Sequence, residues 1–177
     1  MRHGIGLLGG TFDPVHNGHL AIARSFLSHT LIEQLWVILS PDPPHKTDLP
    51  RAPFERRLEM LEAAFGEFNG VKISTIEQNL SRPSYTIQTV RHLKKKYPEQ
   101  PFYLCIGEDS LREFHTWYRY RDLLKECELL VARRPGLSSE DVDQEIMDRA
   151  HFVDHQPVEV SSTEIRNRIA EQQPVDS

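Results

Sequence analysis

Long apolar runs are missing from this sequence, and no hydrophobic stretch approaches the roughly 18 residues that a membrane-spanning helix needs. The first residues, MRHGI, also lack the long apolar stretch and cleavage site of a secretory signal peptide. The two cysteines, Cys105 and Cys127, are too few for a disulfide framework. Both lie in apolar segments with strand character, where a free thiol packs as a small hydrophobe. These absences predict a cytoplasmic protein that spans no membrane.

An excess of positive charge is missing as well. The chain has 21 Lys and Arg residues against 26 Asp and Glu residues, a formal net charge of −5. Proteins that bind duplex DNA or anionic lipid without specificity need a basic surface. The charge balance therefore argues against nucleic acid or a membrane surface as the partner.

The 177 residues suffice for one domain with its own core, and short apolar runs alternate along them with amphipathic segments. We expect strands at residues 5–8, 35–39, 71–74, 102–106, 128–132 and 152–153. We expect helices from Asn17, at residues 54–65, 85–97, 109–126 and 139–149, and from Ser161. This alternation predicts βαβ units in a single-domain, Rossmann-like α/β fold: a doubly wound, mostly parallel sheet with helices on both faces.

Ligands of such sheets bind at the carboxyl ends of the strands, so the segments directly after the strands are the candidate site. The first of them contains two glycines, Gly9 and Gly10, which allow a ligand to approach the backbone closely. Asn17 is a good N-cap, and His16 and His19 lie three residues apart, on one side of the first helical turn. Two imidazoles at a helix N-terminus suit phosphate oxygens that gain charge. A zinc pair is one alternative, but no further ligand follows at metal-site spacing. The other is a purely structural role at the start of the helix, which is the usual role of an isolated pair at this spacing.

The string GGTFDPVHNGH, residues 9–19, resembles the signature of the HxGH nucleotidyltransferases. A second segment, SSTEIR at residues 161–166, opens the last helix, and taken alone Ser161 and Glu164 make an ordinary capping box. Its hydroxyls, free helix N–H groups and Arg166 also suit a polyphosphate. It is similar to the motif that holds the ATP triphosphate in the same superfamily.

Three further segments narrow the resemblance from the superfamily to one family within it. Lys46 lies in a Pro-rich loop, residues 107–118 follow the fourth strand, and residues 133–136 close the fifth. Taken alone, the loop is equally well a solvated turn, and Trp117 a packing residue. Together with the two motifs they resemble the bacterial nicotinate-nucleotide adenylyltransferases over residues 9–169. Pantetheine-phosphate adenylyltransferases and cytidylyltransferases share only the first and last motifs.

The resemblance implies adenylyl transfer from ATP to nicotinate mononucleotide, in line and without a covalent enzyme intermediate, with Mg²⁺ held by the ATP phosphates. It implies that His16, His19 and Arg166 are catalytic and also bind ATP. The other ATP-binding residues would be Gly9, Gly10, Thr11, Phe12, Gly107, Asp109, Arg133, Ser162 and Thr163. The mononucleotide would be bound by Lys46, Thr86, Trp117 and Tyr118.

Two other hypotheses stay open: a transferase of the same fold with another phosphate acceptor, and a nucleotide-binding module without turnover. Residues 1–177 are expected to form one nucleotidyltransferase domain. Relatives usually continue with a further apolar helix, so we expect that helix to be short or missing here. A homo-oligomer is compatible with the sequence, which does not specify the oligomeric state.

Overall fold

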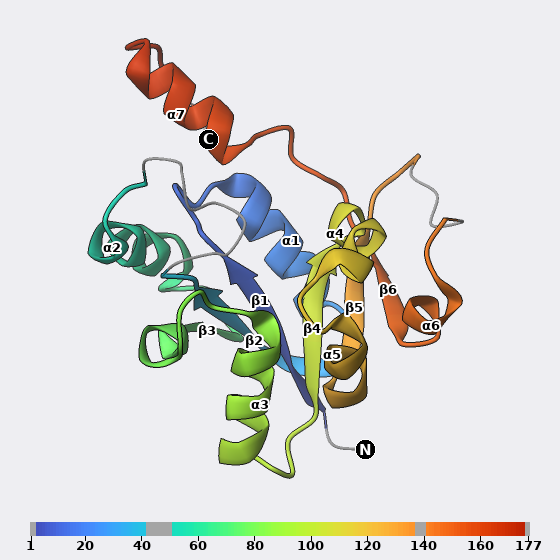
Figure 1. Ribbon diagram of the computed structural model, residues 1–177. Coiled ribbons are helices and arrows are strands. Elements are labelled where there is room, and N and C mark those ends of the chain that lie inside the picture. The colour runs from blue at the N-terminus through green and yellow to red at the C-terminus, as the bar shows by residue number, and fades with distance from the viewer. Residues whose placement is uncertain (1–2, 42–50, 137–140, 176–177) are drawn as a thin grey trace.

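One parallel sheet forms the centre of the molecule, with the strand order β3-β2-β1-β4-β5-β6 (Figure 1). The computed structural model describes residues 3–41, 51–136 and 141–175. The strands are β1 Gly4–Gly10, β2 Ile32–Leu39, β3 Val71–Ser74, β4 Phe102–Gly107, β5 Glu128–Arg133 and β6 Ala150–Asp154. The order reverses between β1 and β4, so loops from both halves of the chain meet there. The predicted α/β fold with a doubly wound parallel sheet is confirmed.

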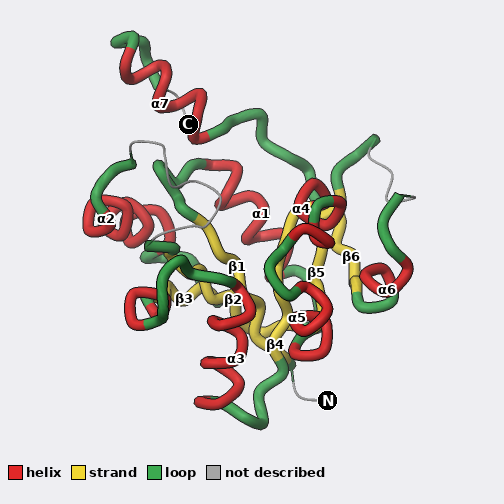
Figure 2. The backbone as a smooth tube through the Cα atoms, in the orientation of Figure 1, coloured by secondary structure: helices red, strands yellow, loops and turns green. Residues whose placement is uncertain are grey.

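Helices cover both faces of the sheet (Figure 2). They are α1 Asn17–Leu27, α2 Phe54–Phe65, η1 Ile76–Asn79, α3 Thr86–Lys96, α4 Glu108–Arg112, η2 Phe114–Thr116, α5 Tyr120–Glu126, α6 Gln144–Met147 and α7 Ser162–Ala170. Apolar side chains of α1 and α2 pack on one face, and those of α3, α5 and α6 on the other. None of the helices in the described ranges combines the length and apolar character needed to cross a bilayer.

The central strands are buried because their side chains are apolar on both faces. Leu35 and Leu39 of β2 are fully buried, as the continuous apolar run predicts. Gly6 of β1 has no room for a side chain, because an added Cβ would lie 2.8 Å from Cys105 Sγ. The glycine therefore allows the two halves of the sheet to pack closely beneath the site.

Two predicted helices are wrong in extent. The expected helix at 109–126 is divided into α4, η2 and α5, with Arg119 in the left-handed region at φ 55°. Trp117 turns out of the helix into the apolar cluster, so tertiary packing overrides the local helical periodicity. The expected helix at 139–149 is reduced to Gln144–Met147 within the described residues. Cys127 caps α5 and precedes β5, whereas Cys105 lies within β4 as expected; both thiols are free and buried.

Candidate active site

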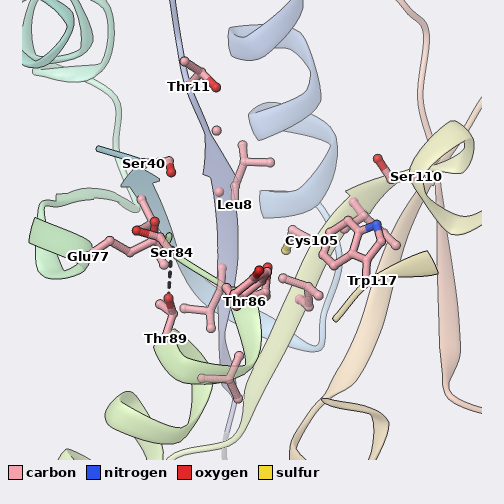
Figure 3. Close-up of a pocket in the computed structure, with 18 of the residues that line it drawn as sticks. Leu8, Thr11, Ser40, Glu77, Ser84, Thr86, Thr89, Cys105, Ser110 and Trp117 are labelled. Carbon is pink, nitrogen blue, oxygen red and sulfur yellow. Dashed lines mark hydrogen bonds between the residues drawn. The ribbon is translucent and has the colours of Figure 1, made fainter. Parts of the chain in front are cut away.

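A cavity of about 390 Å³ opens where the strand order reverses, between the ends of β1 and β4 (Figure 3). Two glycines keep it open: a Cβ added to Gly9 or to Gly107 would meet no heavy atom within 4 Å. Six of the predicted ligand-binding residues besides Gly9 line this cavity, namely Gly10, Thr11, Thr86, Gly107, Trp117 and Tyr118. The cavity therefore combines the predicted mononucleotide-binding side chains with the glycine-rich end of β1.

Aromatic rings form one side of the cavity. Trp117 lies 5.1 Å from Phe114, ring centre to ring centre, and Tyr118 lies 4.3 Å from Tyr85. Trp117 also packs against the buried apolar cluster, so it is a packing residue and a wall of the cavity at once. Tyr118 lines the cavity and is 53% exposed.

The two histidines form a reciprocal cap at the start of α1. His16, and not Asn17 as expected, is the N-cap: its Nδ1 accepts a hydrogen bond from Gly18 N at 3.2 Å. His19 Nδ1 accepts one from His16 N at 3.1 Å, and the two ring centres lie 3.9 Å apart. Because each Nδ1 is an acceptor, each neutral ring carries its proton on Nε2, where it is a donor. Burial lowers the pKa of His16, which favours this neutral form.

The last helix is bound to the loop that carries these histidines. Ser162 Oγ donates to the carbonyl of Pro14 at 2.9 Å, and Arg166 Nη1 donates to the carbonyl of Asp13 at 2.6 Å. Arg166 Nη2 also donates to Thr163 Oγ1 at 3.2 Å. Figure 1 shows α7 at the same end of the molecule as the start of α1. The structure thus brings together two motifs that lie about 150 residues apart in the sequence.

The residues predicted for the adenosine side have partners within the protein. Asp109 forms an ion pair with Arg134 at 3.1 Å, and Arg133 lies over the Phe152 ring at 4.5 Å. Arg134 N also donates to Glu108 Oε2 at 2.8 Å, so the loops after β4 and β5 are joined. Lys46, predicted to bind the mononucleotide, lies outside the described residues.

Sequence reasoning missed a buried arginine below the site. Arg57 of α2 is 2% exposed, and its guanidinium donates to the carbonyls of Thr11, Ser40 and Ala52 at 2.8, 2.9 and 3.1 Å. Burial lowers its pKa, opposed by the nearby carboxylate of Asp13. An arginine in an otherwise amphipathic helix gives no signal of this role, because exposed arginines have the same pattern.

Phe12 completes the turn between β1 and α1. It adopts φ 46°, a left-handed conformation that is uncommon outside glycine, and its ring is buried edge-on against His19, 4.9 Å between centres. Phe12 is predicted as a ligand-binding residue, but the whole residue is only 3% exposed, so its ring is not available to a ligand. The strained turn sets the path of the chain into the segment that carries His16 and His19.

No group of three or more His, Cys, Asp or Glu side chains that could hold a metal ion occurs in the described ranges. The donors around the site are instead imidazoles, hydroxyls, backbone N–H groups and guanidinium groups. Such donors suit the anionic oxygens of a phosphate ligand. A divalent cation could enter the site bound to those oxygens.

Comparison with known families matches residues 7–168 to the cytidylyltransferase-like family. A protein of Bacillus pumilus described as a probable nicotinate-nucleotide adenylyltransferase is 40% identical over 172 residues, covering 97% of this chain and 88% of the relative. A protein of Flavobacterium johnsoniae with the same description is 38% identical, covering 94% of this chain and 86% of the relative. The chain belongs to the nicotinate-nucleotide adenylyltransferase family. It is therefore a nucleotidyltransferase.

Solved structures in this family share the fold. The Plasmodium falciparum nicotinic acid mononucleotide adenylyltransferase, complexed with NaAD, superposes with a TM-score of 0.79 over 98% of this chain and 87% of its own, at 17% identity. A putative nicotinate-nucleotide adenylyltransferase of Vibrio parahaemolyticus gives a TM-score of 0.70 over 98% of this chain and 84% of its own, at 16% identity. At these identities the likeness supports the fold and not the role of any residue.

Proposed function

We propose that this chain transfers the adenylyl group of ATP to nicotinate mononucleotide, releasing pyrophosphate and forming nicotinate adenine dinucleotide, a step of NAD biosynthesis. One observation carries the proposal. The cavity at the strand-order reversal is lined by Thr86, Trp117 and Tyr118, and it begins at the glycine-rich loop that also holds His16 and His19. The substrates of its relatives require such a pair of adjoining subsites, one for a flat ring and one for phosphates.

The mechanism needs little covalent chemistry from the protein. A phosphate oxygen of the mononucleotide attacks the α-phosphorus of ATP, the bond to the β-phosphate oxygen breaks, and pyrophosphate leaves. The Nε2–H groups of His16 and His19 would donate to oxygens that gain charge during this step. Ser162, Thr163 and Arg166 would hold the β- and γ-phosphates, and Mg²⁺ enters with ATP as part of the substrate. The backbones of Gly10, Thr11 and Phe12 would form the wall behind the reacting phosphates.

The predicted adenosine contacts start from a carboxylate that already has a partner. Asp109 Oδ2 pairs with Arg134 at 3.1 Å, and a carboxylate can accept from a ribose hydroxyl as well as from an arginine. The pair is also inexpensive to loosen, since its side chains are 61% and 49% exposed. Arg133 would lie near the adenine. We propose both roles, and we also propose that Lys46 binds the mononucleotide and that the protein is cytoplasmic.

The cavity also favours an acid over an amide at the nicotinate ring. We expect the carboxylate to accept from the Tyr118 backbone N–H and the Thr86 side chain, with positive charge from Lys46. The NH₂ group of nicotinamide would face the Tyr118 backbone N–H and the Lys46 ammonium, neither of which can accept a hydrogen bond from it, and this is costly in a buried site. The carboxylate form of the mononucleotide should therefore have the higher kcat/KM.

The test is pyrophosphate release from MgATP with three acceptors in parallel: nicotinate mononucleotide, nicotinamide mononucleotide and phosphopantetheine. The proposal expects turnover with the first and little with the others. Turnover with phosphopantetheine alone would assign a sister transferase. Stabilisation by ATP without any turnover would assign a nucleotide-binding module.

A further inference from the structure

A buried carboxyl lies in the wall of the cavity, outside every motif described above. Glu77 of η1 is 8% exposed, lines the cavity, and accepts a hydrogen bond from Thr89 Oγ1 at 2.7 Å (Figure 3). Burying a carboxyl is costly unless polar partners compensate. The hydrogen bond from Thr89 supplies part of this compensation.

Its surroundings are hydroxyl groups. Burial raises the pKa of Glu77, and the hydroxyls of Thr89, Ser40 and Ser84 oppose this by stabilising the charged form. Ser84 is 6% exposed; it lies beside the carboxyl, but its Oγ makes no hydrogen bond of good geometry to any described residue. All four side chains line the cavity, and Figure 3 shows them gathered on the side opposite Trp117.

This cluster joins three segments around the first turn of α3. Glu77 follows β3, Ser40 directly follows β2, and Thr89 lies in α3 three residues after Thr86. Thr86 is the first residue of α3, so the bond from Thr89 to Glu77 fixes the helix near the end that faces the cavity. The apolar residues Ile87 and Val90 pack α3 against the sheet, and the bond from Thr89 adds a directional polar contact at its first turn.

We propose that Glu77 is a positioning residue for the mononucleotide subsite: through Thr89 it holds the first turn of α3, and with it Thr86, at the place where the nicotinate ring is bound. This inference rests on the proposed function, because it assigns Thr86 to the mononucleotide. A displacement of about 1 Å in such a contact can cost up to about a hundredfold in rate or binding. The side chains proposed for the triphosphate, those of His16, His19, Ser162, Thr163 and Arg166, are not among the residues that line the cavity with Glu77, so we expect its effect to fall mainly on the mononucleotide.

The experiment compares Thr89→Val, which removes the hydroxyl at nearly constant volume, with Thr89→Ser, which keeps it. KM for nicotinate mononucleotide, KM for ATP and kcat are measured for both variants and for the unaltered chain. We expect Thr89→Val to raise KM for the mononucleotide about tenfold, the equivalent of one lost hydrogen bond to a charged group, with KM for ATP unchanged. Thr89→Ser should restore KM to within about twofold of the unaltered chain.

Glu77→Gln is the second variant, and it keeps an acceptor oxygen while removing the charge. It should raise the same KM less than Thr89→Val does. Calorimetric titration of each variant with nicotinate mononucleotide alone should give the same order of Kd values without any turnover. If Glu77→Gln does not fold, the two Thr89 variants decide.

Three results would overturn the inference. Equal KM values in the unaltered chain and Thr89→Val would show that the bond positions nothing. A parallel rise of both KM values would show a general structural role. If the unaltered chain itself does not turn over nicotinate mononucleotide, the proposed function fails, and this inference fails with it.

Discussion

At the scale of single residues, the two histidines have a structural task and a proposed chemical one. Their Nδ1 atoms cap the first turn of α1, and this leaves the Nε2–H groups as donors. A residue that caps with one nitrogen and donates with the other cannot rotate freely, so its donor is preorganised. Preorganised donors are the groups that contribute most to stabilising charge in a transition state.

His19→Ala should therefore lower kcat by about 10²–10³. Removing the ring also removes a capping acceptor, so His19→Gln is the control: a glutamine at the third helical position caps the N-terminus but lacks the imidazole. Steady-state kinetics and thermal melts of both variants should show equal loss of kcat but a higher Tm for His19→Gln. An alanine variant that keeps more than about a tenth of kcat would contradict a role in catalysis.

At the scale of elements, α2 is connected to the loops of the site by one guanidinium. Arg57 joins the end of β1, through Thr11, to the end of β2, through Ser40. Three carbonyls accept hydrogen bonds from this side chain, and the bond to Ser40 is buried. A buried carbonyl without a partner costs about 1–3 kcal/mol. The loop that carries the histidines is thus supported by a helix that belongs to no motif.

Arg57→Met should lower the free energy of unfolding by at least about 2 kcal/mol, which for a chain of this length lowers Tm by roughly 4–8 °C. The matched control is Arg56→Met, because Arg56 is 72% exposed and forms only a surface pair with Glu59. Its effect should stay within about 0.5 kcal/mol. Equal Tm values for the two variants would refute the account of Arg57.

Prediction of helices from the sequence succeeds where the apolar period is regular and fails where the chain turns around the cavity. The helix at 54–65 has the predicted bounds because its apolar stripe has a regular helical period and faces the sheet. The helix predicted at 109–126 failed because periodicity cannot reveal that Trp117 leaves the helix to pack in the core. Short segments that turn around a cavity are shaped by tertiary contacts, and these leave no period in the sequence.

At the scale of the whole molecule, burial of histidines couples stability to pH. The pKa values of His16, His29 and His155 are all lowered from 6.5, with burial as the largest cause in each. Below about pH 6.5 the unfolded chain binds protons at these sites and the folded chain does not, so stability falls as pH falls through this window. Tm measured from pH 7.5 down to about 5.5 should therefore decrease.

Carboxyls do not reverse this trend. Asp122, Glu126 and Glu145 have lowered pKa values through their hydrogen bonds to neighbouring side chains, and their contribution is lost only below pH 4.5. Glu77 has a raised pKa, so its contribution to stability is present at low pH and is lost as pH rises. This one group has the opposite pH dependence to the three histidines. In the variant His155→Gln, Tm should fall less steeply as pH falls. A Tm of the unaltered chain that is constant or rises on acidification would contradict the assignment of this pH dependence to the buried histidines.

The sequence predicts which segments meet at the candidate site most directly where they carry a contiguous motif. Each of the two segments, 9–19 and 161–166, carries its own motif, and in the structure Ser162 and Arg166 hydrogen-bond to the loop at 9–19. Glu77 and Arg57 escaped prediction because their burial depends on the packing of distant segments. Isolated polar residues of this kind have the same pattern as solvated ones until the fold is known.

The most direct test of the whole account follows the α-phosphate of ATP. The chain is incubated with Mg²⁺, nicotinate mononucleotide and ATP that is radiolabelled at the α-phosphate, and products are separated from protein. We expect the label to appear in nicotinate adenine dinucleotide, with unlabelled pyrophosphate released in equal amount and no label bound to the chain. Label recovered only as ATP or AMP, or covalently on the protein, would contradict direct adenylyl transfer.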